Sequence, residues 1–240
     1  MKIILKKQWD ELIIQLDSLV SYELNYSFSE ITFEILFQNY FHDENRYYHN
    51  ANHIRSCLEN LDYLIKHYRK NKKYNEVSWL AIKLAIWFHD FIYDTHKNNN
   101  EELSSLAAKQ FILGMVDNIK LAEDVGSLIL FTKHNREALT IEEKIFSDID
   151  LYVLGDYGYH ELLEDGYVDK IRKEYIWVPD FIYYPSRLKI IEGFLNREKI
   201  FYNDLFFNQF EFDLERQAKE NISKEVDLIK KRLININGKA

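Results

Sequence analysis

Four consecutive residues, Trp87-Phe88-His89-Asp90, carry the clearest chemical signal in this chain. They close a stretch of helical pattern, so a histidine and an aspartate stand side by side at the end of an apolar helix. Two ionisable side chains in a protein core need partners or a metal ion, because an uncompensated buried charge is costly. With one more histidine and one more aspartate, the set becomes nitrogen and oxygen ligands for a divalent metal. Such a site points to hydrolytic chemistry.

Two histidines compete to be the second imidazole ligand. His89 shares a helical face with Ile86, so it points inward. His53 lies at the edge of the apolar stripe of an upstream helix, on the side of Cys57. His49 precedes it by four residues, in a polar and aromatic segment that is more loop than helix. The residues alone leave His49 and His53 open as alternatives.

The second aspartate also has two candidates. Asp150 has Phe146 four residues before it and Ile149 beside it, so it sits on the apolar face of its own helix. A lone buried carboxylate is costly or takes a proton, and coordination to a metal removes that problem. Asp148 lies two residues earlier and competes with Asp150, and either one is alternatively a solvated or capping residue.

The elements that must position these residues are helices. Seven Gly and two Pro in 240 residues are too few for a turn-rich β protein, and no long segment alternates with period two. The hydrophobic content of 47% is ample for a large core, and no linker or repeat interrupts the chain. We therefore predict an all-α fold in one domain. Helices are expected at 9–19, 29–41, 51–69, 76–89, 101–115, 119–133, 141–154 and 212–233, with shorter ones from residue 159 onward.

The net charge of -8 argues against nucleic acid as a partner, because a duplex-binding protein normally needs a basic face. A small phosphorylated substrate stays compatible with it, since a metal supplies local positive charge. The single cysteine, Cys57, forms no internal disulfide, which favours a reducing, cytoplasmic compartment. The apolar run before Lys6 is too short for a signal peptide, and no window approaches the roughly 20 apolar residues of a membrane span. We expect no membrane partner.

The pattern H…HD…D resembles the HD superfamily of metal-dependent phosphohydrolases, in which four residues from separate helices converge on one divalent metal. Here the match is His53, His89, Asp90 and Asp150. A closer resemblance, to a bacterial subfamily of predicted HD phosphohydrolases, covers most of the chain with blocks in the same order. The blocks are RYYHNANHI (46–54), LAIWFHDFIYD (84–94), NEELSS (100–105), TKHN (132–135), DIDLYVLG (148–155), IRKEY (171–175) and ERQAKEN (215–221).

The resemblance implies an HD-domain helical bundle with additional C-terminal helices over 1–240. Its metal core would cover about 46–155 and its C-terminal extension about 156–240. It favours His53 over His49, because His53 lies within the periodic helix that holds the family's first histidine. It favours Asp150 over Asp148, because the family's ligand aspartate precedes a leucine.

The activity that the resemblance implies is hydrolysis of a small phosphoester, such as a nucleotide, by water that a metal activates. The two-histidine, two-aspartate set suits one ion of Mn, Fe, Co, Ni or Zn, and Mg less well. The alternative is a non-catalytic module of the same fold that binds or senses a nucleotide. A complete H…HD…D set argues against that alternative, because loss of catalysis usually removes a ligand.

Two residues are candidates for further catalytic roles. Asp94 lies four residues after Asp90 in HDFIYDT, which looks like the HDxxxDT run of alarmone hydrolases and makes Asp94 a candidate general acid or base. Tyr93 stands where those enzymes usually carry Glu, so the resemblance does not by itself imply that this chain hydrolyses alarmones. The alternative for Asp94 is a helix cap or a loop residue. His134 could bind phosphate, ligate a second metal as in the diiron oxygenases of this fold, or lie on the surface at a helix end.

An acidic chain needs local cations to attract an anionic substrate. Arg46, Arg172 and Arg187 are the best candidates, because the guanidinium fork fits phosphate bidentately, and Lys133 could steer the phosphate. Each of them is alternatively a salt-bridging or solvated residue. Aromatic side chains in the C-terminal third could stack on a base, although core packing or the face of a homodimer is their more usual use.

Overall fold

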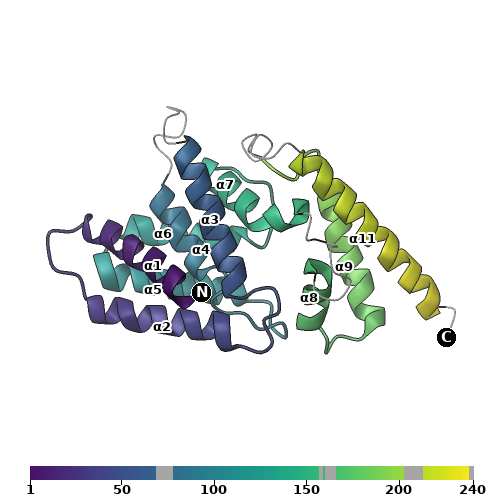
Figure 1. The fold of residues 1–240 in the computed structure, drawn as a ribbon, viewed down its shortest axis with the longest axis horizontal. Helices are drawn as coiled ribbons and strands as arrows, with labels where there is room; N and C mark the ends of the chain where they lie inside the picture. The colour runs from purple at the N-terminus through teal and green to yellow at the C-terminus, as the bar shows by residue number, and fades with distance from the viewer. Residues whose placement is uncertain (69–77, 157–158, 160–165, 203–212, 238–240) are drawn as a thin grey trace. The chain divides into compact units, whose positions relative to one another are not determined.

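The computed structural model describes residues 1–68, 78–156, 159, 166–202 and 213–237 (Figure 1). Their regular structure is helical, mostly α-helix with short 3-10 segments, and no strand occurs among them. The chain divides into two compact units, residues 1–149 and residues 150–240. No helix within the described ranges is long and apolar enough to cross a membrane.

The first unit is built around the helix that leads into the His-Asp pair. Its helices are α1 (Lys2–Asp17), α2 (Tyr26–His42), α3 (Ala51–Tyr68), α4 (Trp79–Phe88), α5 (Asn100–Val116), α6 (Ile119–Phe131) and α7 (Ile141–Asp150). α4 contacts α1, α3, α5 and α6, and every residue from Ala81 to Phe88 is buried. A helix that is apolar all round is suited to this central position.

An aromatic cluster fixes the C-terminal half of α4. Trp9 of α1 is fully buried and meets the ring of Trp87 edge-on, with ring centroids 5.3 Å apart. The Trp9 indole donates a hydrogen bond to Ser29 Oγ of α2 over 2.9 Å, so its ring orientation is set. Edge-to-face aromatic pairs add about 0.5–1.5 kcal/mol beyond the area that they bury. The end of α4 is therefore held rigidly where the His-Asp pair begins.

The second unit contains η2 (Leu151–Gly155), α8 (Tyr167–Glu174), α9 (Asp180–Leu195) and α11 (Leu214–Asn237). α9 and α11 lie side by side, as Figure 1 shows, and α11 also contacts η2. The Asn221 amide donates to the carbonyls of Leu154 and Asp156 over 2.9 and 3.0 Å. A Cβ on Gly155 would lie 2.9 Å from the Leu214 carbonyl oxygen, so α11 approaches this turn too closely for another residue.

The all-α prediction is confirmed for the described residues, with shifts at helix ends. α1 begins at Lys2 rather than at residue 9, since it includes the short apolar run that precedes Lys6. The predicted helix 141–154 is divided in two, because the chain tightens into a 3-10 turn after Asp150. Residue 69, residues 76–77 and residue 212, at the ends of three predicted helices, lie outside the described residues. The single-domain prediction for 1–240 stays a prediction.

Candidate metal site

The site begins at the C-terminal end of α4, where helix geometry leaves carbonyl groups without intrahelical partners. His89 is the C-cap residue, and its ring Nδ1 lies 2.9 Å from the Ile86 carbonyl oxygen. The next carbonyl, of Trp87, accepts a hydrogen bond from the Tyr40 hydroxyl over 3.0 Å, and the Phe88 carbonyl accepts from the Phe91 amide. Side chains and the following turn thus replace the missing helical hydrogen bonds and fix the backbone that carries the His-Asp pair.

The contact with Ile86 determines which nitrogen of His89 faces the site. A carbonyl oxygen can only accept, so Nδ1 carries the hydrogen and Nε2 of the neutral ring presents a lone pair. This Nε2 lies 3.1 Å from His53 Nε2 and 3.0 Å from Asp90 Oδ2. Asp90 Oδ2 lies 3.5 Å from His53 Nε2. Three atoms that bind cations therefore meet at one point.

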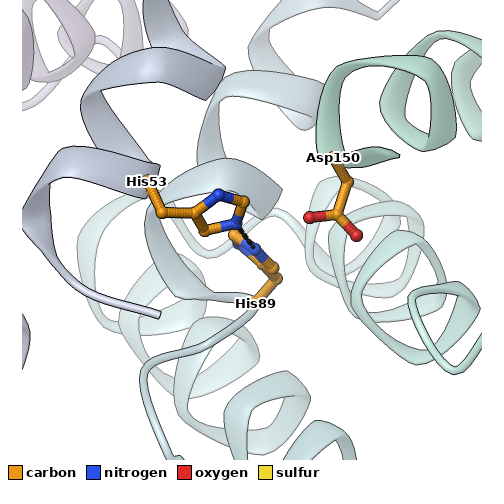
Figure 2. Close-up of side chains that lie close together, drawn as sticks. All are labelled: His53, His89 and Asp150. Atoms are coloured by element: carbon orange, nitrogen blue, oxygen red, sulfur yellow. Dashed lines mark hydrogen bonds between the residues drawn. The ribbon is translucent and has the colours of Figure 1, made fainter. Parts of the chain in front are cut away.

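Asp150 joins the two histidines from a third helix. One ligand atom each of His53, His89 and Asp150 lies within 4.8 Å of the other two, and this group could hold a metal ion. Figure 2 shows the two imidazole rings meeting through their Nε2 atoms and the Asp150 carboxylate directed toward them. Asp150 is the last residue of α7, and the division of the chain falls directly before it.

The residues present fit a divalent metal. Asp90 Oδ2 is buried and accepts no hydrogen bond, an arrangement that costs free energy unless a cation compensates it. Burial raises the pKa of the Asp90 carboxyl, but the neighbouring imidazoles, His89 first and then His49 and His53, outweigh burial and hold that pKa well below its usual range. Asp90 is then an ionised oxygen ligand beside two imidazole nitrogens, a donor set that suits first-row transition metals.

His53 reaches this point because α3 is amphipathic. Its buried stripe is formed by Ala51, His53, Ile54, Cys57, Leu58, Leu61, Leu64 and Tyr68. The His53 ring packs against Tyr48, with centroids 4.9 Å apart, and its Nδ1 lies 3.8 Å from Cys57 Sγ one turn later. His53 was predicted at the edge of this stripe, and the structure shows that its side chain is buried there.

The two alternative ligands, His49 and Asp148, are outside the group of ligand atoms that lie within 4.8 Å of one another. The His49 ring packs tilted against Tyr93, with ring centroids 4.5 Å apart, and its centroid lies 6.0 Å from that of His53. His49 also lowers the pKa of Asp90, but it does not belong to the mutually close group of described ligand atoms. Asp148 is completely buried, and it does not belong to the mutually close group of described ligand atoms. The structure thus gathers the residues that the resemblance favoured, while metal binding itself stays a prediction.

Asp94, a predicted catalytic residue, is bound into its own loop. Oδ1 accepts a hydrogen bond from the backbone amide of His96 over 3.0 Å, and Lys97 Nζ lies 3.1 Å from Oδ2. These contacts, the His96 amide first and Lys97 second, lower the pKa of the Asp94 carboxyl. The Asn100 side chain bridges the Asp94 backbone, donating to its carbonyl and accepting from its amide. Asp94 accordingly has the loop role that was its alternative, and its catalytic role stays a prediction.

His134 and Lys133 follow the end of α6. His134 adopts the left-handed backbone conformation, with φ 48°, and its ring contacts Phe131 with centroids 5.9 Å apart. Lys133 Nζ lies 2.5 Å from Glu102 and 3.8 Å from Glu101, so it is a salt-bridging lysine. None of these contacts involves the His-Asp cluster, and the predicted site roles of both residues stay predictions.

The three predicted phosphate-binding arginines are each engaged within the protein. Arg172 donates to the carbonyls of Tyr175 and Val178 and to Asp180, and Arg187 forms a two-pronged ion pair with Glu225. Both lie in the second unit. Arg46 is buried and donates to backbone carbonyls beside the His-Asp pair. These contacts engage all three guanidinium groups within the protein, and the predicted substrate-binding roles stay predictions.

Two further residues hold this site, and the hydrogen bonds by which they do so were not predicted from residue types. Tyr40 reads as part of the apolar pattern of α2, yet its hydroxyl supplies a hydrogen bond to α4. Ser104 is fully buried, and its Oγ accepts a hydrogen bond from the Ile92 amide over 3.0 Å. The NEELSS segment carried the available signal, since Ser104 and Asn100 both face the loop after the His-Asp pair.

Comparison of the chain with protein-family models, with curated proteins and with solved structures finds no match. The class of the protein is therefore defined here by its fold and its site: an all-α chain with a cluster of two histidines and an aspartate that could hold a metal ion. Asp90, which touches both imidazoles of that cluster, extends it to four residues.

Proposed function

We propose that this chain is a metal-dependent phosphohydrolase of the HD type, acting on a small phosphoester such as a nucleotide. The observation that supports the proposal most strongly is the meeting of His53, His89 and Asp150, with an oxygen of Asp90 beside both imidazoles. The same four residues make up the H…HD…D pattern, and they come from three places in the sequence: His53, the adjacent pair His89-Asp90, and Asp150. Asp90 follows His89 directly, so the independent observation is that Asp150 also reaches the two histidines.

The four side chains would supply two kinds of metal ligand, imidazole nitrogen and carboxylate oxygen. Nδ1 of His89 is held by the Ile86 carbonyl, which orients Nε2 toward the cation and raises its basicity. Asp90 and Asp150 contribute negative charge, so a divalent ion is neutralised by two carboxylates and two neutral rings. A bound divalent metal supplies Lewis-acid stabilisation of phosphoryl charge and lowers the pKa of a water molecule. We expect Mn, Fe, Co, Ni or Zn rather than Mg, because imidazole suits those ions better.

The experiment is a hydrolysis screen with matched variants. Wild type, with Mn²⁺, Co²⁺, Ni²⁺ or Zn²⁺, is incubated with a panel of nucleotides and phosphomonoesters, and products are separated by chromatography. We expect turnover that chelation abolishes, and a loss of about 10³-fold or more in His53→Ala, since a metal contributes several kcal/mol to the barrier. His67→Ala is the control, because His67 lies on the exposed side of the same helix.

Absence of all hydrolysis, while an established HD phosphohydrolase is active in the same panel, would contradict the proposal. Thermal stabilisation by a nucleotide without turnover would instead indicate the binding module.

A further inference from the structure

The side chain of Arg46 contacts the turn that carries the His-Asp pair. The Arg46 side chain is 2% exposed, and its guanidinium donates to the carbonyl oxygens of Asp90 over 2.6 Å and of Phe91 over 2.8 Å. A weaker hydrogen bond of 3.4 Å runs to the carbonyl of His49. All three acceptors belong to segments that carry or flank the histidines and aspartates of the site.

The guanidinium is also fixed from its other sides. It lies over the rings of Tyr40 and Tyr93, with distances of 5.2 and 5.4 Å to the centroids, and Nε donates to Asp43 Oδ2 over 3.3 Å. Each of its three nitrogens is engaged, and the charge is compensated by one carboxylate. This planar fork spans two consecutive carbonyls, which a lysine ammonium, a single point of charge, does not match.

The contacts couple Arg46 to a proposed ligand. Asp90 offers its carbonyl oxygen to Arg46 and its carboxylate oxygen to the two imidazoles. The peptide that Arg46 holds is therefore the one from which the carboxylate projects, so rotation of that peptide would move Oδ2 away from His89 and His53. Helix α4 ends at Phe88, so this peptide lies beyond the helix. Its amide, that of Phe91, donates to the Phe88 carbonyl over 3.0 Å, and its carbonyl oxygen, that of Asp90, is held by Arg46.

We propose that Arg46 is a positioning residue of the metal site, which fixes the backbone of Asp90 and Phe91 so that the Asp90 carboxylate meets the two imidazoles. The inference rests on the proposed function, because it assigns the consequence of that positioning to metal affinity. Residues that orient metal ligands typically change metal affinity by about 10- to 100-fold when they are replaced.

The test compares Arg46→Lys with Arg172→Lys. Arg172 is a matched control: it also donates to two backbone carbonyls, over 2.5 and 3.1 Å, and lies over a tyrosine ring, that of Tyr183, within the second unit. Two quantities are measured for each folded protein. One is the affinity for Co²⁺, with its visible absorption spectrum, and the other is amide hydrogen exchange at Phe91 and Ile92 without metal.

We expect Arg46→Lys to bind Co²⁺ about 10- to 100-fold more weakly, with an altered spectrum, and to exchange faster at Phe91 and Ile92. Arg172→Lys should stay within about twofold of wild type in both. Unchanged affinity and spectrum in Arg46→Lys, or equal losses in the two variants, would overturn the inference. If Arg46→Lys fails to fold, Arg46→Gln, which keeps an amide donor, is subjected to the same measurements.

The failure of the proposed function has a different signature. Wild type that binds no Co²⁺ would refute metal binding itself. The exchange measurement, made without metal, then still decides the positioning role: faster exchange confined to Phe91 and Ile92 supports it, and unchanged exchange overturns it.

Discussion

The buried Asp90 oxygen leads to a prediction in which stability and metal binding change in opposite directions. In the metal-free protein Oδ2 faces two imidazole nitrogens and accepts no hydrogen bond. Asp90→Asn replaces one carboxylate oxygen by an amide that can donate to His89 Nε2, whose lone pair faces it. The substitution keeps the shape of the side chain and removes a charged ligand.

The two effects have magnitudes that can be separated. A net hydrogen bond contributes about 0.5–1.5 kcal/mol, so the free energy of unfolding of the metal-free variant should equal that of wild type or exceed it by about 1 kcal/mol. A metal at 100 times its Kd stabilises wild type by about 2.7 kcal/mol. At about 2–4 °C per kcal/mol, this is a rise in Tm of roughly 5–10 °C. If the variant binds about 100-fold more weakly, its Tm rises by only about 1 °C at the same concentration.

The assay is calorimetric unfolding at pH 8, where an ordinary histidine is neutral, with a chelator or with saturating Co²⁺. Asp94→Asn is the control, since the Asp94 carboxylate is bound by its own loop and should leave the metal-induced shift unchanged. The reasoning would be refuted if metal-free Asp90→Asn lost more than about 1 kcal/mol, because the carboxylate would then be well satisfied without a cation. Equal metal-induced shifts in wild type and Asp90→Asn would refute it as well.

Three further predictions concern the surrounding structure. Tyr40→Phe leaves the buried Trp87 carbonyl without its donor and should cost about 1–3 kcal/mol in denaturant unfolding; a loss below about 0.3 kcal/mol would contradict the role given to the hydroxyl. The hydrogen bond from Arg136 lowers the pKa of Glu143 in the folded protein. Wild type should therefore exceed Glu143→Gln in free energy of unfolding by its maximum amount at pH 7, and the excess should shrink as the pH falls below about 4.3. An excess that does not change with pH would contradict this. Glu225→Leu leaves the buried Arg187 guanidinium uncompensated and should destabilise the protein by about 3–5 kcal/mol in denaturant unfolding. Co²⁺ affinity should not change at temperatures where the variant is folded. A loss of stability below about 1 kcal/mol would contradict the role given to this ion pair.

Helical periodicity was sufficient to predict most of the fold. The central position of α4 followed from apolar residues on all its sides, and α3 from its single buried stripe. The same periodicity placed His89 inward and His53 at the edge of its stripe, and the resemblance then favoured His53 over His49 as a ligand. Helix ends were less predictable, because a 3-10 turn after Asp150 satisfies the same apolar spacing as a continuing helix.

The roles of the cations could not be predicted from residue type. Arg46 is predicted to bind phosphate because a guanidinium fits it, and the structure shows that the same fork also fits two carbonyls just beyond a helix end. The hydrogen bonds of Arg46 join segments about 45 residues apart in sequence. The spacing of residues along the chain does not predict such long-range contacts. Tyr40 was hidden for the same reason: its apolar ring explains its place in α2, and its hydroxyl acts on another helix.

The central claim, a divalent metal held by His53, His89, Asp90 and Asp150, is tested most directly by metal stoichiometry. Protein is loaded with Co²⁺ or Mn²⁺, freed of excess ion and analysed for bound metal. Wild type and His67→Ala should each retain about one ion per chain, and His53→Ala and Asp150→Ala should retain almost none. Equal retention in all four proteins, or no retention in wild type, would contradict the account.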